Sequence, residues 1–390
     1  MRQVIIGMII GMIAGVIIGA TVIRPHINPP TMETAQAVNN VDTPTTANTS
    51  RLTPKASTAT EEPPAPTEPE TVHWRMTSAY TGSLPVLGEL PKRIESAISQ
   101  ISDGQFEIKF HEPGTMVPPQ DLFEAVRSGT IQAGFSSPAL WAEKVPALQL
   151  FSSIPFGPQT REFLAWFRQG GGQEIYDDIY DKQGLHGLVC GVTSPEASGW
   201  FKKPVSTPDD LKGLRMRITG LGARVMEKLG VSTEMLMNAD IIVAMNSGAI
   251  DAAEFSQPAM DFSLGLHRTA GIVYFPGWHQ PTTLYDLMIN KKAWQALSDP
   301  AKAQIEAVCG DNIWRGLTAA DSKQFGALKR YTKLGIQMKT WGPELLLAFH
   351  NAWNQVAKEL SDKDKDFRRA WNSLQKFREE FGIWDELSAP

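Results

Sequence analysis

The chain opens with one long apolar run. Residues 4–23 contain only apolar or small side chains and no charge, and about twenty such residues span the hydrocarbon core of a bilayer as a helix. The hydrophobic segment of a cleaved signal is usually shorter, about 7–15 residues, and a small-x-small triplet at residues 35–37 lies well beyond the run. We therefore expect residues 1–24 to form a retained transmembrane anchor or uncleaved signal.

Residues 25–71 show the opposite pattern. They are rich in Thr and Pro with scattered Glu and have no apolar period, a composition that cannot bury enough apolar surface to fold. We predict that they form a disordered linker between the anchor and a folded domain. Within the anchor, glycines recur at every fourth position, which places them on one helical face and favours close approach of a partner helix; they are Gly7, Gly11, Gly15 and Gly19.

From residue 72 onward, short apolar runs with strand character alternate with amphipathic helical stretches. The predicted strands are 72–76, 106–110, 132–136, 185–192, 214–218 and 250–255, with helices at 87–101 and 121–127. Alternation of this kind indicates mainly parallel sheets covered by helices, an α/β fold. The last third differs, because residues 300–329 and 343–381 show the apolar period of long helices.

Composition narrows the class of protein. The chain has 390 residues, of which 42% are hydrophobic, and a formal net charge of -5, which fits a globular protein with two domains. No basic cluster is present, so nucleic acid is not an expected partner. Cys190 and Cys309 stand far apart in no metal-binding spacing, and we expect both to be buried free thiols.

Known catalytic motifs are missing from the sequence. There is no GxSxG or HExxH motif, and the histidines show no ligand spacing. Gly220-Leu-Gly222 follows a strand and opens a helix like a dinucleotide fingerprint, but Val225 occupies the third glycine position. We interpret this segment as a tight turn whose helix N-terminus faces a cleft and favours an anionic ligand. We expect no enzyme activity.

Three short stretches together offer the chemistry for recognising a small carboxylate. Arg217 ends one predicted strand, Glu254 and Phe255 end another, and Gln280 follows an aromatic segment later in the chain. A planar guanidinium can take both oxygens of a carboxylate, and flanking polar groups fix its orientation. A binding protein is therefore favoured over an enzyme.

Longer motifs carry a resemblance to a known family. The segments Glu124-Ala-Val-Arg-Ser-Gly129, Gln132-Ala-Gly-Phe-Ser-Ser137, Ile154-Pro-Phe-Gly157 and Thr207-Pro-Asp-Asp-Leu-Lys-Gly213-Leu-Arg-Met-Arg217 resemble the DctP family. Its members are solute-binding proteins of tripartite ATP-independent periplasmic (TRAP) transporters, and the similarity covers residues 72–384. The segments Gly199-Trp-Phe201, Asp251-Ala-Ala-Glu254 and Tyr274-Phe-Pro-Gly-Trp-His279 are similar to the subgroup that binds 2-oxo or 2-hydroxy carboxylates, often with a bridging metal cation.

The resemblance implies an α/β, two-lobe periplasmic-binding-protein-like fold with a hinge and long C-terminal helices. The implied boundaries are 72–193 for the first part of lobe I, 194–282 for the first part of lobe II, 283–322 for a return to lobe I, and 323–390 for C-terminal helices on lobe II. Segments near Thr193 and Thr283 cross between the lobes and imply closure on a ligand.

The resemblance also implies roles for individual residues. Arg217 binds the ligand carboxylate, and Glu254 with the carbonyl of Phe255 binds Na⁺ or Ca²⁺, which prefer oxygen donors. Glu196 and Gln280 contribute to both the ligand and the cation. No organic cofactor is expected.

The chain departs from the subgroup pattern at several of these positions. Phe255 replaces a Trp, Glu196 replaces a Gln, and Gln280 replaces an acidic residue, so one acid has moved between two loops. Where the family has paired tyrosines, this chain has Ala139 and Leu140, followed by Trp141. We therefore predict a roomier, more apolar wall to which Trp141 contributes.

The expected function is that of an extracytoplasmic receptor that captures a small organic carboxylate and delivers it to TRAP membrane subunits. We expect a periplasmic protein tethered to the inner membrane by its N-terminal helix. The apolar seam between residues 367 and 381 permits a homodimer. Two alternatives stay open, a membrane-tethered ligand-sensing module that acts through the glycine-faced helix, and a carboxylate-processing enzyme.

Overall fold

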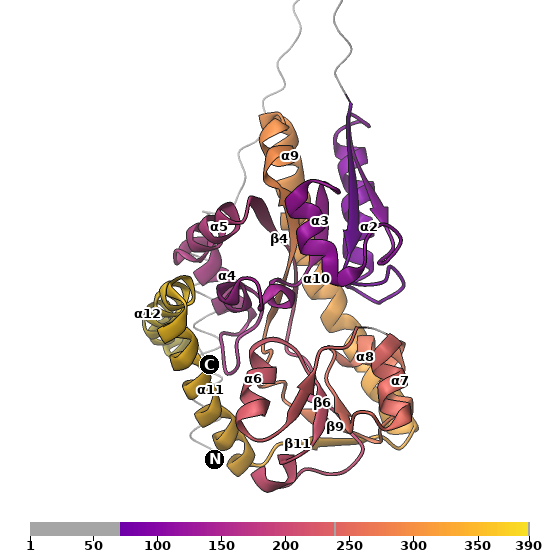
Figure 1. Ribbon diagram of the computed structural model, residues 1–390, viewed down its shortest axis with the longest axis vertical. Coiled ribbons are helices and arrows are strands. Elements are labelled where there is room, and N and C mark those ends of the chain that lie inside the picture. The colour runs from indigo at the N-terminus through magenta and orange to yellow at the C-terminus, as the bar shows by residue number, and fades with distance from the viewer. Residues whose placement is uncertain (1–70, 238, 389–390) are drawn as a thin grey trace, which may run out of the picture. The chain divides into compact units, whose positions relative to one another are not determined.

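The computed structural model describes residues 71–237 and 239–388, and it places two β-sheets within them (Figure 1). The first sheet has the strand order β2-β1-β3-β10-β4. Its strands are β1 (Val72–Ser78), β2 (Phe106–His111), β3 (Ala133–Ser136), β4 (Leu185–Thr193) and β10 (Thr283–Asn290). Every residue of β10 is buried, as expected for a central strand covered on both faces. We call this sheet and the helices on it lobe I.

The second sheet has the order β11-β9-β5-β8-β6-β7 and forms lobe II with its own helices. Its strands are β5 (Gly199–Phe201), β6 (Arg215–Arg217), β7 (Ser232–Glu234), β8 (Ala252–Ala253), β9 (Ile272–Phe275) and β11 (Gln337–Thr340). Both sheets are mixed rather than mainly parallel, because β10 runs antiparallel to β3 and β4, and β5 runs antiparallel to β8 and β9. The hydrophobic pattern of a sequence indicates which strands are buried. Buried strands occur in mixed and in parallel sheets alike, so the pattern could not distinguish the two.

Helices cover both sheets and form the C-terminal third. The α-helices are α2 (Glu89–Ile101), α3 (Leu122–Ser128), α4 (Thr160–Gln169), α5 (Gly172–Lys182), α6 (Gly220–Lys228), α7 (Ala239–Ser247), α8 (Pro258–Leu264), α9 (Lys291–Ala296), α10 (Asp299–Lys333), α11 (Pro343–Lys363) and α12 (Lys365–Ser388). Short 3-10 turns lie at Pro119–Asp121, Pro138–Trp141, Pro146–Phe151, Pro208–Leu211 and Leu266–Arg268. On α11 the buried side chains recur every three or four residues, which is the spacing that turns one helical face to the core.

The two lobes meet where β4 ends and β10 begins. Thr193 and Thr283 are register partners in that strand pair, so both segments that cross between the lobes start from one point of the first sheet. The 35 residues of α10 run alongside both lobes (Figure 1). At its lobe II end, the hydroxyl of Tyr331 donates to the carbonyl of Pro258 at 2.6 Å.

The expectation of two free cysteines is wrong. Cys190 on β4 and Cys309 on α10 form a disulfide, with their Cα atoms 4.2 Å apart and a sequence separation of 119. The sequence did locate one cysteine in a strand and the other in a helix. Only the packing of α10 against the edge strand brings them within bonding distance, and no local pattern reports that packing.

The C-terminal helices do not all cover lobe II as expected. The helix α11 packs against α6 of lobe II, but α12 lies against α4 and α5 of lobe I. Ion pairs join Lys182 to Asp366 at 2.9 Å and Arg378 to Glu162 at 3.1 Å. Residues 323–390 therefore do not belong to one lobe.

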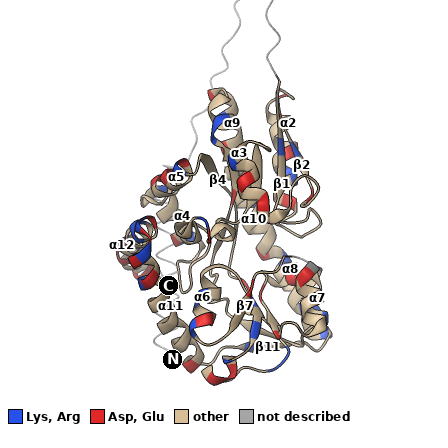
Figure 2. Ribbon diagram, viewed as in Figure 1, with Lys and Arg blue, Asp and Glu red and all other residues tan. Residues whose placement is uncertain are grey.

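The expected membrane anchor at residues 1–24 and the expected linker at 25–71, apart from Thr71, lie outside the described residues. Among the residues that the structure describes, no helix is both long and apolar enough to cross a membrane. Basic and acidic side chains are interspersed along α12 in the view of Figure 2.

Candidate functional site

A small cavity of about 50 Å³ lies between the two lobes. Five segments of lobe II reach it: the end of β6 with the start of α6, Met237 after β7, the residues after β8, the loop after β9, and the loop that precedes β5. Lobe I contributes Tyr80, Leu87, the 3-10 turn that begins at Pro138, and Tyr285 on β10. A ligand in this cavity would therefore contact both lobes.

Arg217 ends β6 and lines the cavity, although only 5% of its surface is exposed. Its Nε atom donates to the carbonyl of Leu236 at 3.0 Å, and Nη1 donates to both the backbone carbonyl and the carboxylate of Glu254. The guanidinium carbon lies 5.6 Å from the ring centre of Phe255. The Nη2 atom makes no hydrogen bond to any described residue, so Arg217 keeps donors for a ligand while three contacts hold it in place.

Glu254 follows β8 and is fully buried beneath the cavity. Its Oε1 atom accepts a hydrogen bond from Gln280 at 3.3 Å and lies 3.6 Å from Nε2 of His279. Burial alone would raise the pKa of Glu254, but the imidazole of His279 and the guanidinium of Arg217 outweigh burial and hold that pKa below its usual value. Glu254 is therefore an anion at neutral pH.

Glu196 enters the same space from the loop after β4 and is 3% exposed. Its Oε1 atom accepts hydrogen bonds from Ser256 at 3.2 Å and Thr283 at 3.3 Å, whereas its Oε2 atom is buried and has no partner among the described residues. Burial, and then the neighbouring carboxylate of Glu254, raise the pKa of Glu196 well above its usual value. This carboxylate lacks a charge partner.

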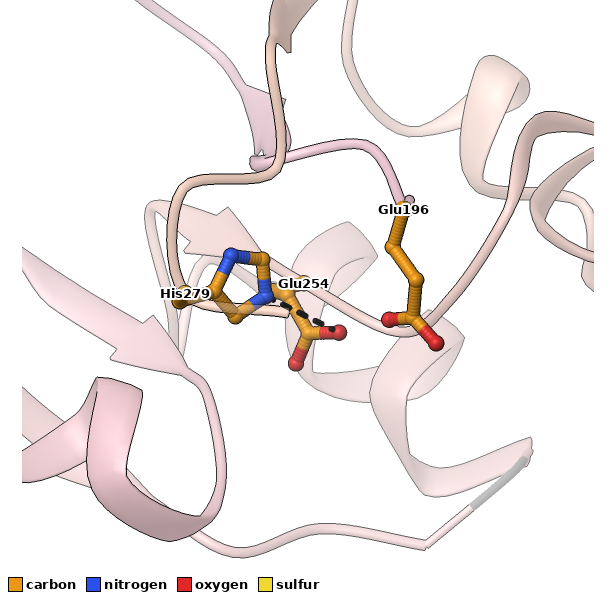
Figure 3. Close-up of side chains that lie close together, drawn as sticks. All are labelled: Glu196, Glu254 and His279. Carbon is orange, nitrogen blue, oxygen red and sulfur yellow. Dashed lines mark ion pairs between the residues drawn. The ribbon is translucent and has the colours of Figure 1, made fainter. Parts of the chain in front are cut away.

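Glu196, Glu254 and His279 form one cluster in which a possible ligand atom of each lies within 4.8 Å of the others (Figure 3). The figure shows the carboxylates of the two glutamates turned toward one another, with the ring of His279 beside Glu254. Both ring nitrogens of His279 and Oε2 of Glu196 are buried without a hydrogen-bond partner in the described part of the chain. Buried oxygen and nitrogen atoms that have no hydrogen-bond partner, gathered around two carboxylates, are suitable ligands for a cation.

The lobe I side of the cavity is neither wholly apolar nor roomy. Leu87, Ala139 and Leu140 line it, but hydroxyl-bearing side chains do so too, and the volume is only about 50 Å³. The hydroxyl-bearing residues are Tyr80, Ser137, Ser153, Thr283 and Tyr285. The expected contribution of Trp141 is not seen, because Trp141 does not line the cavity. Its indole packs against Phe123 and donates to Oγ of Ser136, inside lobe I.

The N-terminus of α6 does face the cavity, as the sequence predicted. Thr219, Gly220, Leu221 and Gly222 all line it, and Gly222 lies so close to the 276–280 loop that an added Cβ would sit 3.0 Å from the Cβ of His279. The positive end of this helix therefore contributes to a site for an anion.

Several site residues were missed in the sequence. His279 does not stand at a metal-binding spacing from any other histidine, and Glu254, which it approaches in the structure, lies 25 positions away in sequence. The neighbouring Gln280 was predicted as a site residue, but His279 was not. Tyr80 and Tyr285 come from lobe I and pack edge to face with their ring centres 5.7 Å apart. No local motif marks either tyrosine. They meet only because β1 and β10 lie on opposite sides of β3.

The model of the bacterial extracellular solute-binding proteins of family 7, DctP, matches residues 78–364 of the chain. The chain belongs to this family. This DctP-family protein is 31% identical over 318 residues to a monocarboxylate 2-oxoacid-binding periplasmic protein of Nostoc sp. (strain PCC 7120), a match that covers 81% of this chain and 87% of the relative.

Solved structures of similar proteins share the fold of this DctP-family chain. A TRAP transporter solute-binding protein from Bordetella bronchiseptica RB50 has a TM-score of 0.80 at 32% identity, covering 82% of this chain and 95% of that one. It is a mixed-occupancy dimer with copurified calcium and picolinate in one site. A TRAP solute-binding protein from Colwellia psychrerythraea with bound calcium and pyruvate has a TM-score of 0.79 at 27% identity, covering 82% and 97%.

These similarities confirm the expected class of this DctP-family protein and its two-sheet α/β fold with long C-terminal helices. It is a periplasmic solute receptor that works with TRAP membrane subunits, and it is not an enzyme.

Proposed function

We propose that the protein captures a small monocarboxylate of the 2-oxo or 2-hydroxy acid class together with a bridging cation. The observation that carries the proposal is the charge around the cavity, where two buried carboxylates, Glu196 and Glu254, face one guanidinium, Arg217. Among the described residues, Arg217 is the one Lys or Arg side chain that lines the cavity.

The charges require a cation once a carboxylate ligand enters. With both glutamates ionised, Arg217 leaves a net charge of -1, and a monocarboxylate makes it -2. An uncompensated charge in a buried site costs several kcal/mol. A divalent cation cancels this charge, whereas a monovalent cation leaves a net charge of -1.

The donor atoms favour a hard cation. Two carboxylates supply oxygen, and the backbone carbonyl of Phe255 at the cavity wall supplies a third oxygen donor. The imidazole of His279 packs against the carboxylate of Glu254 at 3.6 Å without a hydrogen bond. We propose Ca²⁺ ahead of Na⁺, with Glu196, Glu254 and Phe255 as its protein ligands and Gln280 holding Glu254 in place.

The ligand carboxylate then bridges this cation and Arg217. The free Nη2 atom of Arg217 and the N-terminus of α6 both present donors to it, while Phe255 and Leu140 pack on the rest of a small molecule. Sodium or calcium with pyruvate, and calcium with picolinate, occupy similar proteins, which supports this chemistry. Lobe closure excludes water and strengthens the ion pairs, and the closed form delivers the ligand to the TRAP membrane subunits.

The test measures binding by the full chain in mild detergent with isothermal titration calorimetry. Pyruvate, lactate and picolinate are titrated with and without Ca²⁺, Na⁺ or Zn²⁺. We expect Arg217→Lys to weaken carboxylate binding at least 30-fold, because a buried charge pair loses about 2–5 kcal/mol when one partner is altered. Arg215→Lys is the matched control, since Arg215 lies on the same strand but is exposed and pairs with Asp251 at 2.8 Å. Unchanged binding by Arg217→Lys would refute the assignment.

We also propose that residues 1–24 tether the receptor to the inner membrane through the linker at 25–71. The uncharged apolar run at residues 4–23 supports this proposal. Membrane fractionation of the tagged chain tests it, because a cleaved receptor would appear in the soluble periplasmic fraction. The domain boundaries before residue 323 and a homodimer through α12 stay predictions, and light scattering of the purified chain tests the dimer. Binding without any TRAP membrane subunit encoded nearby would favour the sensing alternative.

A further inference from the structure

Asp261 is a fully buried carboxylate that does not line the cavity. It lies on α8 of lobe II and has two partners. Its Oδ2 atom accepts from the indole Nε1 of Trp200 at 2.8 Å, and its Oδ1 atom accepts from the backbone N–H of Ser256 at 3.0 Å. A buried carboxylate held by only two neutral donors is costly, so the fold keeps Asp261 for more than packing.

The bond to Ser256 fixes a peptide plane at the cavity. The peptide between Phe255 and Ser256 is trans, so its N–H and C=O point in opposite directions. With the N–H held by Asp261, the carbonyl of Phe255 points away from α8. That carbonyl accepts no hydrogen bond from the described residues, whereas the carbonyl before it, of Glu254, is taken by Arg217.

Ser256 itself adds a second constraint on the same segment. Its side chain donates to Glu196 at 3.2 Å, and its carbonyl accepts from the backbone of Ala197 at 3.2 Å. The residues after β8 are therefore tied to the Glu196 loop on one side and to Asp261 on the other.

We propose that Asp261 is a positioning residue that aims and polarises the carbonyl of Phe255 as a ligand for the bridging cation. This inference rests on the proposed function, because it needs a cation between Glu196 and Glu254. A hydrogen-bond acceptor behind a peptide N–H increases the partial negative charge on the carbonyl oxygen of that peptide. Outer partners of this kind change metal affinity by about 10–100-fold.

A purely structural role for Asp261 predicts something different. Asp261 lies in the first turn of α8 and reaches back to an N–H just before the helix, as a capping side chain does. A cap stabilises the helix but has no reason to alter cation binding in the folded protein. Cation affinity, measured separately from stability, therefore distinguishes the two roles.

The experiment measures Ca²⁺ affinity by calorimetry, and the factor by which Ca²⁺ tightens pyruvate binding, for the full chain in mild detergent. Asp261→Asn should weaken Ca²⁺ at least tenfold and reduce that coupling factor by a similar amount, since coupling is reciprocal. Trp200→Phe is the matched control, because it removes the other partner of Asp261 and leaves the Ser256 bond. It should lower the melting temperature and keep Ca²⁺ affinity within twofold.

The double variant Trp200→Phe/Asp261→Asn provides a rescue. In Asp261→Asn alone, the side-chain amide oxygen can face the N–H of Ser256 only if the amide NH₂ faces the indole N–H of Trp200. Two hydrogen-bond donors then oppose one another, which disfavours this orientation. Without the indole, the amide is free to accept from Ser256, so the double variant should recover part of the lost Ca²⁺ affinity. If Asp261→Asn binds Ca²⁺ within twofold of wild type, the inference falls and the proposed function stands. If the wild type binds no cation, both fall.

A measurement on the wild type covers the case in which Asp261→Asn does not fold. Labelling with carbonyl-¹³C Phe and ¹⁵N Ser selects the four Phe-Ser peptides of the chain, at 135–136, 151–152, 255–256 and 262–263. Ser256→Ala identifies the resonance of the third. Addition of Ca²⁺ with pyruvate should shift the Phe255 carbonyl more than the other three carbonyls. An unmoved Phe255 carbonyl would overturn the inference.

Discussion

Replacing Glu196 by Gln should change which cation the protein prefers. The ligand atoms of Glu196 and Glu254 lie within 4.8 Å of one another, so a cation held between them is no farther than that from either. At this separation, and with an effective dielectric constant of about 20, one pair of unit charges interacts by about 3.5 kcal/mol. Loss of the Glu196 charge therefore removes about 7 kcal/mol of attraction for Ca²⁺ and about half of that for Na⁺.

The difference between the two cations is the useful quantity. Burial raises the pKa of Glu196, so the cation-free site takes up a proton that any cation must displace, and this cost lowers both affinities equally. It cancels in their ratio. We expect Glu196→Gln to reduce the preference for Ca²⁺ over Na⁺ by at least tenfold, since the Coulomb difference between the two cations is about 3.5 kcal/mol at the largest separation that the cluster allows.

Calorimetry supplies the test, with Ca²⁺ titrated into protein in sodium-free buffer and Na⁺ measured by competition. Asp286→Asn is the matched control, since it removes one charge from a carboxylate that is also fully buried but lies in lobe I, bonded to Tyr176 at 2.9 Å. A Ca²⁺/Na⁺ ratio within threefold of wild type in Glu196→Gln would refute the reasoning, whatever happens to the absolute affinities.

Three further predictions concern the scaffold. Burial raises the pKa of Asp286 from 3.8 to about 6, so the folded state holds this proton to higher pH than the unfolded chain and loses about 2 kcal/mol of stability as pH rises from 4 to 7. Urea titrations of Asp286→Asn should lack that loss, and a pH profile parallel to that of the wild type would contradict the assignment. Replacing Cys190 and Cys309 by Ser should lower the free energy of unfolding by about 2–4 kcal/mol without altering carboxylate affinity, as measured by urea denaturation and calorimetry; unchanged stability would show that the disulfide constrains little. Gly277→Ala should abolish cation binding in calorimetry, because its Cβ would lie 2.3 Å from the backbone oxygen of Glu196, and wild-type affinity would argue against this close approach.

The strand ends that contribute site residues could be predicted from the sequence, because an apolar strand followed by polar residues is a local pattern. Arg217 and Glu254 were predicted at such ends, and both lie beside the cavity as expected. Trp141 shows the limit of this reasoning. It follows Ala139 and Leu140 on a tight 3-10 turn, where each residue is rotated by about a third of a turn from the last, so its neighbours line the cavity while its own side chain faces the core.

Contacts between distant segments could not be predicted in the same way. The disulfide, the edge-to-face pair of Tyr80 and Tyr285, and the approach of His279 to Glu254 all depend on how the two sheets and α10 assemble. The central strand β10 was missed as a strand, and with it the register that brings Thr283 beside Thr193.

The exchange of acid and amide between positions 196 and 280 makes physical sense once the two loops are seen together. The backbone N–H of Glu196 donates to the carbonyl of Gln280 at 3.2 Å, and the amide of Gln280 donates to Glu254. An acid at either position therefore lies next to the same carboxylate and supplies the same charge to a cation. It follows that Gln280→Glu should restore to Glu196→Gln most of its lost Ca²⁺ preference. If the preference of the double variant for Ca²⁺ over Na⁺ stays as low as that of Glu196→Gln, the two positions are not equivalent, and the position of the charge rather than its amount determines the choice of cation.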